Sequence, residues 1–403
     1  MKILHLGDVH LGVELHGRPL PGKGYGSRVA DFLAALDHAL TAADECDLVL
    51  FPGDIYHMCS PTPTLQREFA ARLCALTAKK PVVIIPGNHD LPNAWGKASS
   101  VDIFHALALP NLWVFRTPTV ERIPTAAGDV LLAALPFLPK SHLCADTSTA
   151  GFTPAEVNTL MSSILADTVG HLADTAAAMG RDAERLPCVL LAHWTVEGAS
   201  YGGFRHSSFG ADIVLPQSCL CDPRFDYIAL AHLHQHQAPL PTAVYPGSIE
   251  RVDFGEEHEP KGFVVADVEY GHAEWKFRFL PARRFVTLDI TGETWDDLQP
   301  QLAMADVEDA VVRVRYTLPA GVPSPSDRDV RQCLLGAHHI AGVAREQAPR
   351  AVPARETRLT ASVTPQAALG LYLDSRPELA GQRGELERLG LELIAGVTAK
   401  GAE

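Results

Sequence analysis

The first 280 residues alternate short apolar runs with amphipathic segments. Five of the runs have the length of a buried strand: Lys2–Leu6, Leu48–Phe51, Val82–Ile85, Val189–Ala192 and Tyr227–Ala231. Between them, Ala30–Leu40 and Thr64–Leu76 carry apolar residues at helical spacing. Thr62 or Thr64 is the expected N-cap of the second helix. Strands that alternate with helices predict an α/β fold.

Each of the five runs is followed at once by a polar turn. The turns carry nine candidate functional residues: Asp8, His10, Asp54, Asn88, His89, Asp90, His193, His232 and His234. Because the strands of an α/β sheet bring their carboxyl ends to one edge, where ligands and catalytic groups gather, we expect these side chains to converge. Each turn alone is common, but five that agree predict a metal site. Asp90 is expected to orient a neighbour or to cap a helix.

The pattern changes after Arg284. Phe285–Ile290 and Ala310–Tyr316 are predicted strands, and Trp295–Met304 and Gln332–Arg345 are predicted helices. This region contains no cluster of potential ligands. The change of pattern, together with a length of 403 residues, indicates two or three domains.

The C-terminal part differs again. Gln347–Gln366 is rich in Pro, Arg and Thr, which is typical of a linker. Beyond it, Leu379, Leu386 and Leu393 are spaced by sevens and predict an apolar stripe on a charged helix.

Composition narrows the class of protein. With 47% apolar and 20% charged residues, the chain is typical of a soluble globular protein. No apolar run approaches the roughly 20 residues of a membrane helix. The first residues do not show the sequence pattern of a signal peptide, so we expect a cytoplasmic protein. The eight cysteines are scattered, without a Cys-x-x-Cys pair, and are expected to be reduced core or loop residues.

The net charge of −14 argues against a broad basic face. Bound divalent cations would cancel part of that charge at the site itself, and local basic groups such as Lys276–Arg284 can still meet phosphates. The net charge therefore does not decide whether the substrate is a nucleic acid.

The candidate ligands are two carboxylates, one amide and four imidazoles, from Asp8, Asp54, Asn88, His10, His193, His232 and His234. Mixed oxygen and nitrogen donors without thiolate suit manganese, iron, zinc or magnesium. Seven ligands exceed one site once room is left for water and substrate, so they suit two metals that share a carboxylate. Two ions about 3.5–4 Å apart clamp the attacking and leaving oxygens of an in-line displacement, which is phosphoester chemistry.

Two further histidines remain for proton transfer. His89 directly follows the amide ligand, so its imidazole should reach the phosphate or the leaving oxygen. His57 lies three residues after Asp54. Beside divalent cations, a histidine acts more readily as an acid or a phosphate donor than as a third ligand.

In order, Asp8-Val9-His10, Gly53-Asp54, Gly87-Asn88-His89-Asp90, His193 and His232-Leu233-His234 resemble the motif set of the calcineurin-like metallophosphoesterases. A narrower resemblance comes from the stretch from Tyr245 to Glu256, followed by Pro260-Lys261-Gly262-Phe263, and from Leu191 to Val196. These stretches are similar to the SbcD exonuclease subunit family of bacterial double-strand-break repair. The likeness covers the region before Arg284 well and the rest more loosely.

The resemblance implies a metallophosphoesterase β-sandwich flanked by helices, followed by a small α/β capping domain and C-terminal helices. It implies a nuclease domain over 1–280, a DNA-contacting capping domain over 281–346, and a linker with an ATPase-binding helical segment over 347–403. Two manganese ions are implied. Asp8, His10, Asp54 and His234 would hold one ion, and Asp54, Asn88, His193 and His232 the other. His89 and His57 would be the catalytic residues.

The function implied is that of a manganese-dependent nuclease. It would act as a 3'-5' exonuclease on double-stranded DNA and as an endonuclease on single-stranded or hairpin DNA. Its partners would be DNA ends and hairpins and the SMC-like ATPase SbcC. A homodimer would pair with two ATPase subunits in a heterotetramer, away from any membrane.

Two positions depart from the superfamily pattern. His57 stands where protein phosphatases of the superfamily carry Asp, which favours the nuclease branch. Ala231 stands where Gly is usual before His232, and would strain the turn if that position needed a positive φ.

Two alternative functions remain open. One is another calcineurin-like phosphoesterase, acting on a cyclic nucleotide, a phosphoprotein or a lipid precursor. The other is a DNA-end scaffold subunit whose cleavage is secondary.

Overall fold

The structure, a computed structural model, describes residues 1–92, 96–139, 152–203, 213–346, 365–374, 381 and 383–400. The chain forms two compact units, Met1–Glu346 and Gln347–Glu403. No helix in these described ranges is long and apolar enough to cross a membrane. Seven cysteines within them are free.

Two six-stranded sheets dominate the first unit. The first sheet has the order β14-β13-β1-β2-β3-β4 and the second β11-β12-β10-β7-β6-β5. The strands of the first are β1 (Lys2–His5), β2 (Leu48–Phe51), β3 (Val82–Ile84), β4 (Leu112–Val114), β13 (Gly262–Glu269) and β14 (His272–Phe279). Those of the second are β5 (Thr119–Thr125), β6 (Gly128–Leu135), β7 (Cys188–His193), β10 (Tyr227–Ala231), β11 (Gln237–Leu240) and β12 (Ala243–Tyr245).

The sheets stack face to face over a shared apolar layer, in which Ile3 and Leu50 of one sheet meet Val189 and Tyr227 of the other. Because both faces of the central strands are buried, these strands read as continuous apolar runs. Four strands of each sheet run parallel to one another. They are β1 to β4 in the first sheet and β6, β7, β10 and β12 in the second. Their carboxyl ends therefore share one edge.

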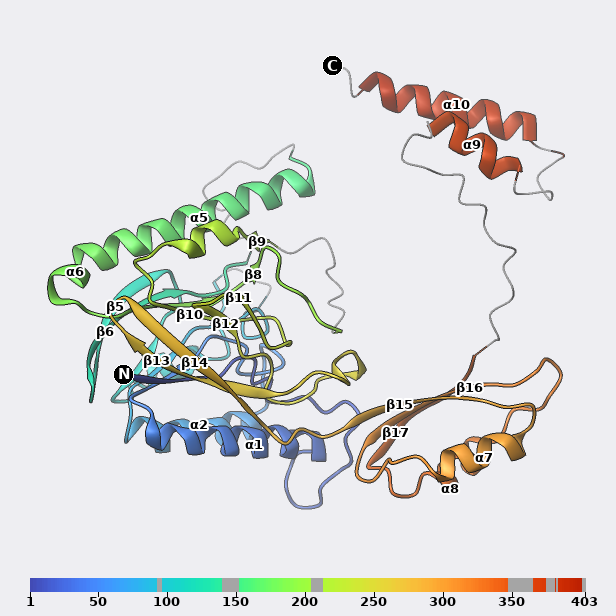
Figure 1. Cartoon of the computed structure of the whole chain (residues 1–403), viewed down its shortest axis with the longest axis horizontal. Helices are drawn as coiled ribbons and strands as arrows, with labels where there is room; N and C mark the ends of the chain where they lie inside the picture. Colours follow the sequence, from blue (N-terminus) through green and yellow to red (C-terminus); the bar gives the residue numbers. More distant parts are fainter. Residues whose placement is uncertain are drawn as a thin grey trace. The chain divides into compact units, whose positions relative to one another are not determined.

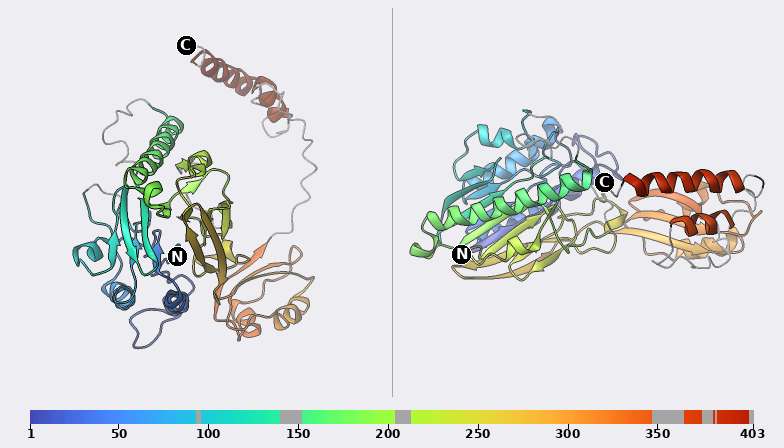
Figure 2. Two further views of the ribbon diagram at one scale, coloured as in Figure 1. Left: turned by 60° about the vertical axis from the view of Figure 1, so that its left-hand side comes forward. Right: turned by 90° about the horizontal axis from the view of Figure 1, so that it is seen from above.

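Helices cover the two outer faces. α1 (Ser27–Leu40) and α2 (Pro63–Thr77) pack on the first sheet, and α5 (Pro154–Ala178) packs on the second. Figure 1 shows these helices on opposite sides of the sandwich, and Figure 2 gives two further directions. Thr62, one of the two N-cap candidates expected from the sequence, caps α2 by accepting a hydrogen bond from the Leu65 amide. The predicted sandwich flanked by helices is confirmed.

Short elements complete this part of the chain. They are the helices α3 (Asp102–Ala106) and α6 (Arg181–Glu184), the 3-10 turns η1 (Thr41–Glu45), η2 (Gln217–Cys221) and η3 (Phe254–Glu256), and the paired strands β8 (Thr195–Val196) and β9 (Val214–Leu215).

A small parallel sheet with its own core follows. It consists of β15 (Phe285–Thr291), β16 (Val311–Thr317) and β17 (His339–Glu346), in that order, with α7 (Trp295–Ala303) and α8 (Asp327–Cys333). The prediction of a helix over Gln332–Arg345 is wrong. Helix α8 ends at Cys333, and most of the rest of that range belongs to β17, which pairs with β16.

The second unit contains α9 (Pro365–Asp374) and α10 (Arg383–Lys400), which contact each other. Most of the predicted linker, and Leu379 of the predicted stripe, lie outside the described residues. The division of the first unit at residue 281 remains a prediction.

Candidate metal centre

The polar turns after the central strands lie at the shared edge of the sandwich, and several adopt strained backbone. Asp8, His10 and Asp54 have φ of 42°, 46° and 52°, and His232 has φ of 105°. L-residues in such conformations cost of order 1–3 kcal/mol each, and they cluster at functional sites. Ala231 lies in β10 without positive φ. The departure from Gly at that position therefore causes no strain, because the unusual φ falls on His232.

One group of potential ligands consists of Asp8, His10 and His234, whose ligand atoms all lie within 4.8 Å of one another. All three residues are buried. The Nε2 atoms of His10 and His234 are 2.9 Å apart. The Nδ1 of His234 lies 2.7 Å from a Glu256 carboxylate oxygen. Because a carboxylate accepts, Nδ1 carries a proton, and in a neutral ring Nε2 holds the lone pair on the side of His10.

A second group, also within 4.8 Å, consists of Asp54, His193 and His232. Asn88 joins it, since its Oδ1 lies 2.8 Å from His232 Nδ1 and 3.0 Å from His193 Nε2. The two groups are linked by the backbone as well, because the His232 amide donates to the Asp8 carboxylate at 3.1 Å.

Asp54 lies between the two groups. Its Oδ2 is 3.3 Å from His193 Nε2 and 3.7 Å from His10 Nε2, and its Oδ1 accepts from the His89 amide at 2.8 Å. Burial opposes ionisation, but His193, His89 and His10 outweigh it and hold the pKa of Asp54 well below its usual range. Asp54 is thus an ionised carboxylate placed to serve both groups.

The surroundings of His193 show whether these residues suit a cation. His193 Nδ1 donates to the Pro52 carbonyl at 2.7 Å, so in a neutral ring Nε2 carries a lone pair. That lone pair would face the Asp54 carboxylate. Burial lowers the pKa of His193, but Asp54 and Asp8 raise it to about 9. The site thus favours positive charge at this point, which a divalent cation would supply. The buried His and Asp groups fit a binuclear metal centre.

Two glycines make room for this arrangement. A Cβ at Gly53, where φ is 109°, would come under 3.0 Å from His193 Nδ1. A Cβ at Gly87 would come under 3.0 Å from Asp54 Oδ1. Side chains at these positions would displace two of the potential ligands.

His89 and His57 lie at the more open side of the centre, where both are half-buried. Their rings stack with centroids 5.4 Å apart, and the His89 ring meets that of His10 edge to face at 4.8 Å. His89 Nδ1 donates to the His57 carbonyl at 2.8 Å. Desolvation, followed by His89, lowers the pKa of His57 to about 4, so His57 is neutral at pH 7. Ligand atoms of His10, His57 and His89 also lie within 4.8 Å of one another.

Asp90 binds the turns together. Its carboxylate accepts from the amides of Ile55, Tyr56 and Gly87 at 3.0–3.2 Å, and from Ser100 Oγ at 2.9 Å. It therefore joins the turn after β2 to the turn after β3. Of the two alternatives offered by the sequence, orienting neighbours is the one that these contacts support.

Sequence reasoning missed Glu256 and Lys261, which lie behind His234. Both side chains are fully buried, and Lys261 Nζ lies 2.6 Å from Glu256 Oε2. No periodicity marks them, because Glu256 lies in the single turn η3 and Lys261 lies in the connection between η3 and β13. The only indication of them in the sequence is that they lie in the stretches Tyr245 to Glu256 and Pro260 to Phe263, which are similar to the SbcD family.

Known proteins resemble this chain over much of its length. A family model for the calcineurin-like phosphoesterases matches residues 1–236. The SbcD component of the nuclease SbcCD from Rhodobacter capsulatus is 30% identical over 261 residues, or 59% of each chain. The corresponding SbcCD component from Bacillus subtilis is 26% identical over 291 residues, or 68% of each chain. The DNA double-strand break repair protein Mre11 of Haloferax volcanii is 26% identical over 322 residues, 78% of this chain and 60% of that one. The chain thus spans 59–68% of the length of these relatives.

Proposed function

The chain belongs to the calcineurin-like phosphoesterase family, and from this premise we propose that it is a two-metal DNA nuclease of the SbcD and Mre11 type. The hydrolase class follows from the family. The observation that carries the proposal is the pair of adjacent buried groups, Asp8–His10–His234 and Asp54–His193–His232, with Asp54 within reach of both. A centre with two ions is the form suited to phosphodiester cleavage.

In this proposal Asp8, His10, Asp54 and His234 hold one ion, and Asp54, Asn88, His193 and His232 hold the other. Two divalent ions held there would lower the pKa of bound water and offset negative charge on the phosphate. Mixed carboxylate, amide and imidazole donors admit manganese, which we propose as the metal.

His89 is the proposed proton donor. Its Nδ1 is committed to the His57 carbonyl, so Nε2 is the nitrogen that would deliver a proton to the leaving oxygen or bind the phosphate. His57 stacks on His89 and limits the rotation of its ring. General acid–base help of this kind contributes typically about 10²–10⁴-fold in rate.

DNA is proposed as the substrate because the relatives carry the names of a nuclease subunit and of a DNA repair protein. By the same likeness, we propose 3'-5' exonuclease action on duplex ends and endonuclease action on single strands and hairpins. The residues 281–346 would contact DNA as a capping domain. The segment 347–403 would bind an SbcC-type ATPase in a cytoplasmic complex built on a homodimer of this chain.

The test is an assay of chelated protein on labelled linear duplex and hairpin DNA, with and without added manganese, beside a cyclic nucleotide. We expect DNA cleavage only with the metal, and none by Asp54→Ala. The position of the label reports the polarity. Cleavage of the cyclic nucleotide alone would contradict the nuclease assignment, and tight end binding without cleavage would favour a scaffold.

A further inference from the structure

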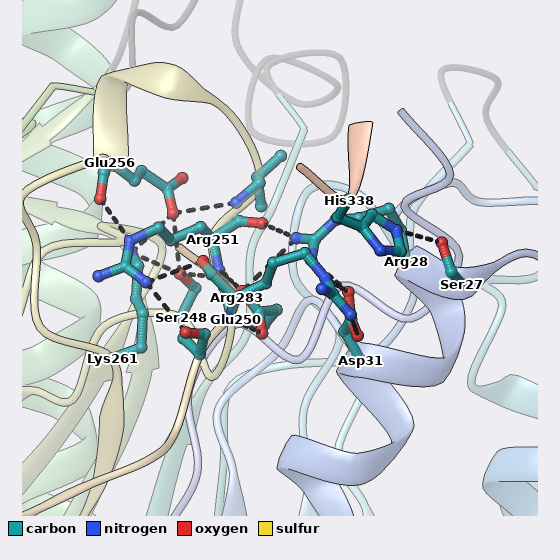
Figure 3. A network of polar contacts seen from close by, with 12 residues as sticks. Ser27, Arg28, Asp31, Ser248, Glu250, Arg251, Glu256, Lys261, Arg283 and His338 are labelled. Atoms are coloured by element: carbon teal, nitrogen blue, oxygen red, sulfur yellow. Dashed lines mark hydrogen bonds and ion pairs between the residues drawn. The ribbon is translucent and has the colours of Figure 1, made fainter. Parts of the chain in front are cut away.

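Behind the metal ligand His234 lies a buried ionic cluster formed by Glu256 and Lys261. Figure 3 shows it with Ser248 and Arg251. The side chains of Glu256 and Lys261 are both 0% exposed. A buried ion pair loses hydration on both partners and is weak evidence for stability. Stability alone therefore does not explain why this ion pair lies next to a candidate ligand.

Glu256 divides its two carboxylate oxygens between two tasks. Oε1 accepts from His234 Nδ1 at 2.7 Å. Oε2 accepts from the Val252 amide at 3.1 Å and from Ser248 Oγ at 3.3 Å, and lies 2.6 Å from Lys261 Nζ. The side of the carboxylate away from the histidine is thus fully used, so the carboxylate cannot rotate without losing several partners.

Lys261 holds the same assembly from a second direction. Besides Glu256, three acceptors surround its ammonium group: Ser248 Oγ at 2.9 Å, Glu259 Oε2 at 3.1 Å and the backbone carbonyl of His234 at 3.2 Å. The three N–H bonds of the ammonium group are shared among these four acceptors. It therefore contacts both the carboxylate that orients the His234 ring and the main chain that carries the ring.

The loop that supplies Glu256 and Lys261 is itself tied down. Arg251 donates from Nε to the Glu256 carbonyl at 3.1 Å and from Nη2 to the Glu259 carbonyl at 2.9 Å. Its Nη1 donates to the Arg283 carbonyl at 3.0 Å, just before β15. Figure 3 shows Arg251 in this network with Glu256 and Arg283.

We propose that Glu256 and Lys261 are positioning residues of the metal centre. Glu256 keeps the proton of His234 on Nδ1 and aims Nε2 at the ion shared with Asp8 and His10, while Lys261 fixes the direction of that carboxylate. Partners of this kind set the tautomer and the ring orientation of a ligating histidine, and their loss typically costs about 10–100-fold in metal affinity. The inference rests on the proposed two-metal centre.

The experiment measures manganese binding by titration calorimetry, together with the free energy of unfolding. In Glu256→Ala we expect one of the two sites to weaken by about 10–100-fold and the other to stay unchanged. Glu256→Gln keeps an acceptor oxygen but loses the charge, so we expect a smaller loss at the same site. Lys261→Met should weaken that site in the same direction.

Asp226→Asn is the matched control. Asp226 is also buried, pairs with Arg181 at 2.7 Å and accepts from two backbone amides, but it belongs to neither group of ligands. It should lose stability and keep both metal affinities. Imidazole nitrogen NMR of the metal-free protein, at a pH high enough for the His234 ring to be neutral, gives a second measurement. The His234 signal should then show a proton on Nδ1 in the wild type and a mixture of tautomers in Glu256→Ala.

The outcomes separate this inference from the proposed function. Folded Glu256 variants with wild-type affinity at both sites would overturn the positioning role, and if Glu256→Ala does not fold, Glu256→Gln decides. Wild-type protein that binds no manganese would overturn it as well. Protein that binds two ions, weakens as expected in the variants, and cleaves no DNA would instead refute the nuclease assignment alone.

Discussion

His5 should make the stability of the first unit sensitive to acid. Its side chain is fully buried between the two sheets, where Nε2 donates to the Leu230 carbonyl at 3.1 Å and Nδ1 lies 2.9 Å from the Tyr227 hydroxyl. Because the carbonyl can only accept, Nδ1 is the acceptor for the tyrosine. Both ring nitrogens are therefore satisfied while the ring is neutral.

Burial, opposed in part by the Leu230 carbonyl, lowers the pKa of His5 to about 3 from its ordinary value of 6.5. Between these values the unfolded chain binds a proton that the folded chain does not. Stability is therefore fully present above pH 6.5 and is lost as the pH falls toward 3. Each pH unit in this window is worth about 1.4 kcal/mol, so the loss at pH 5 is about 2 kcal/mol.

The assay compares wild type with His5→Gln, whose amide can also donate and accept but does not titrate. Urea unfolding at about pH 7.5 and about pH 5 gives the free energy of unfolding for each protein. The residues of the metal centre titrate in both proteins, so the difference between the two pH dependences isolates His5. We expect the wild type to lose about 2 kcal/mol more than the variant over this interval. Equal losses would refute the reasoning.

Three further predictions concern the centre and the tail. His89→Gln should keep both metals and lose about 10²–10⁴-fold in rate, whereas His193→Gln should lose metal first. Metal analysis and kinetics on both variants test this, and loss of metal from His89→Gln but not from His193→Gln would contradict it. Gly87→Ala should lower metal occupancy, because its Cβ would collide with an aspartate carboxylate. The control Gly170→Ala, with nothing within 4 Å of its Cβ, should bind metal as the wild type does. Equal metal occupancy in the two variants would contradict this prediction. Deletion of the residues after Gln366 should spare metal-dependent nicking and abolish co-purification with an SbcC-type ATPase, the proposed partner. A truncated chain that still co-purifies with it would reject the role proposed for the tail.

The sandwich could be predicted because its central strands are buried on both faces. Such strands appear in the sequence as uninterrupted apolar runs, and the polar turn that follows each one marks its carboxyl end. Leu48–Phe51 and Tyr227–Ala231 form strands with the predicted bounds. The convergence of the turns then follows from parallel pairing, a property of the fold class rather than of any single residue.

The wrong helix over Gln332–Arg345 has a local cause. The range joins the end of a true helix, α8, to a strand, and apolar residues such as Leu334 and Ile340 suit either element when runs are short. Gly336 and Gly342 weaken a helix there, and β-branched Ile340 and Val343 favour a strand. Pairing with β16 decides the outcome, and that contact is not visible in a local pattern.

The supporting residues of the site were harder to predict than its candidate ligands. Glu256 and Lys261 act through backbone groups and buried side chains that come from other turns. A Glu or Lys is expected at the surface unless it is paired, and nothing in the local sequence shows which partner is available. Their roles depend on the packing of loops that only the folded chain brings together.

The most direct test of the two-metal centre is anomalous diffraction at the manganese edge from crystals grown with manganese. We predict two peaks on either side of the Asp54 carboxylate, one beside His10 and His234 and the other beside His193 and His232. A single peak, or an ion held by His10, His57 and His89 instead, would contradict the centre described here.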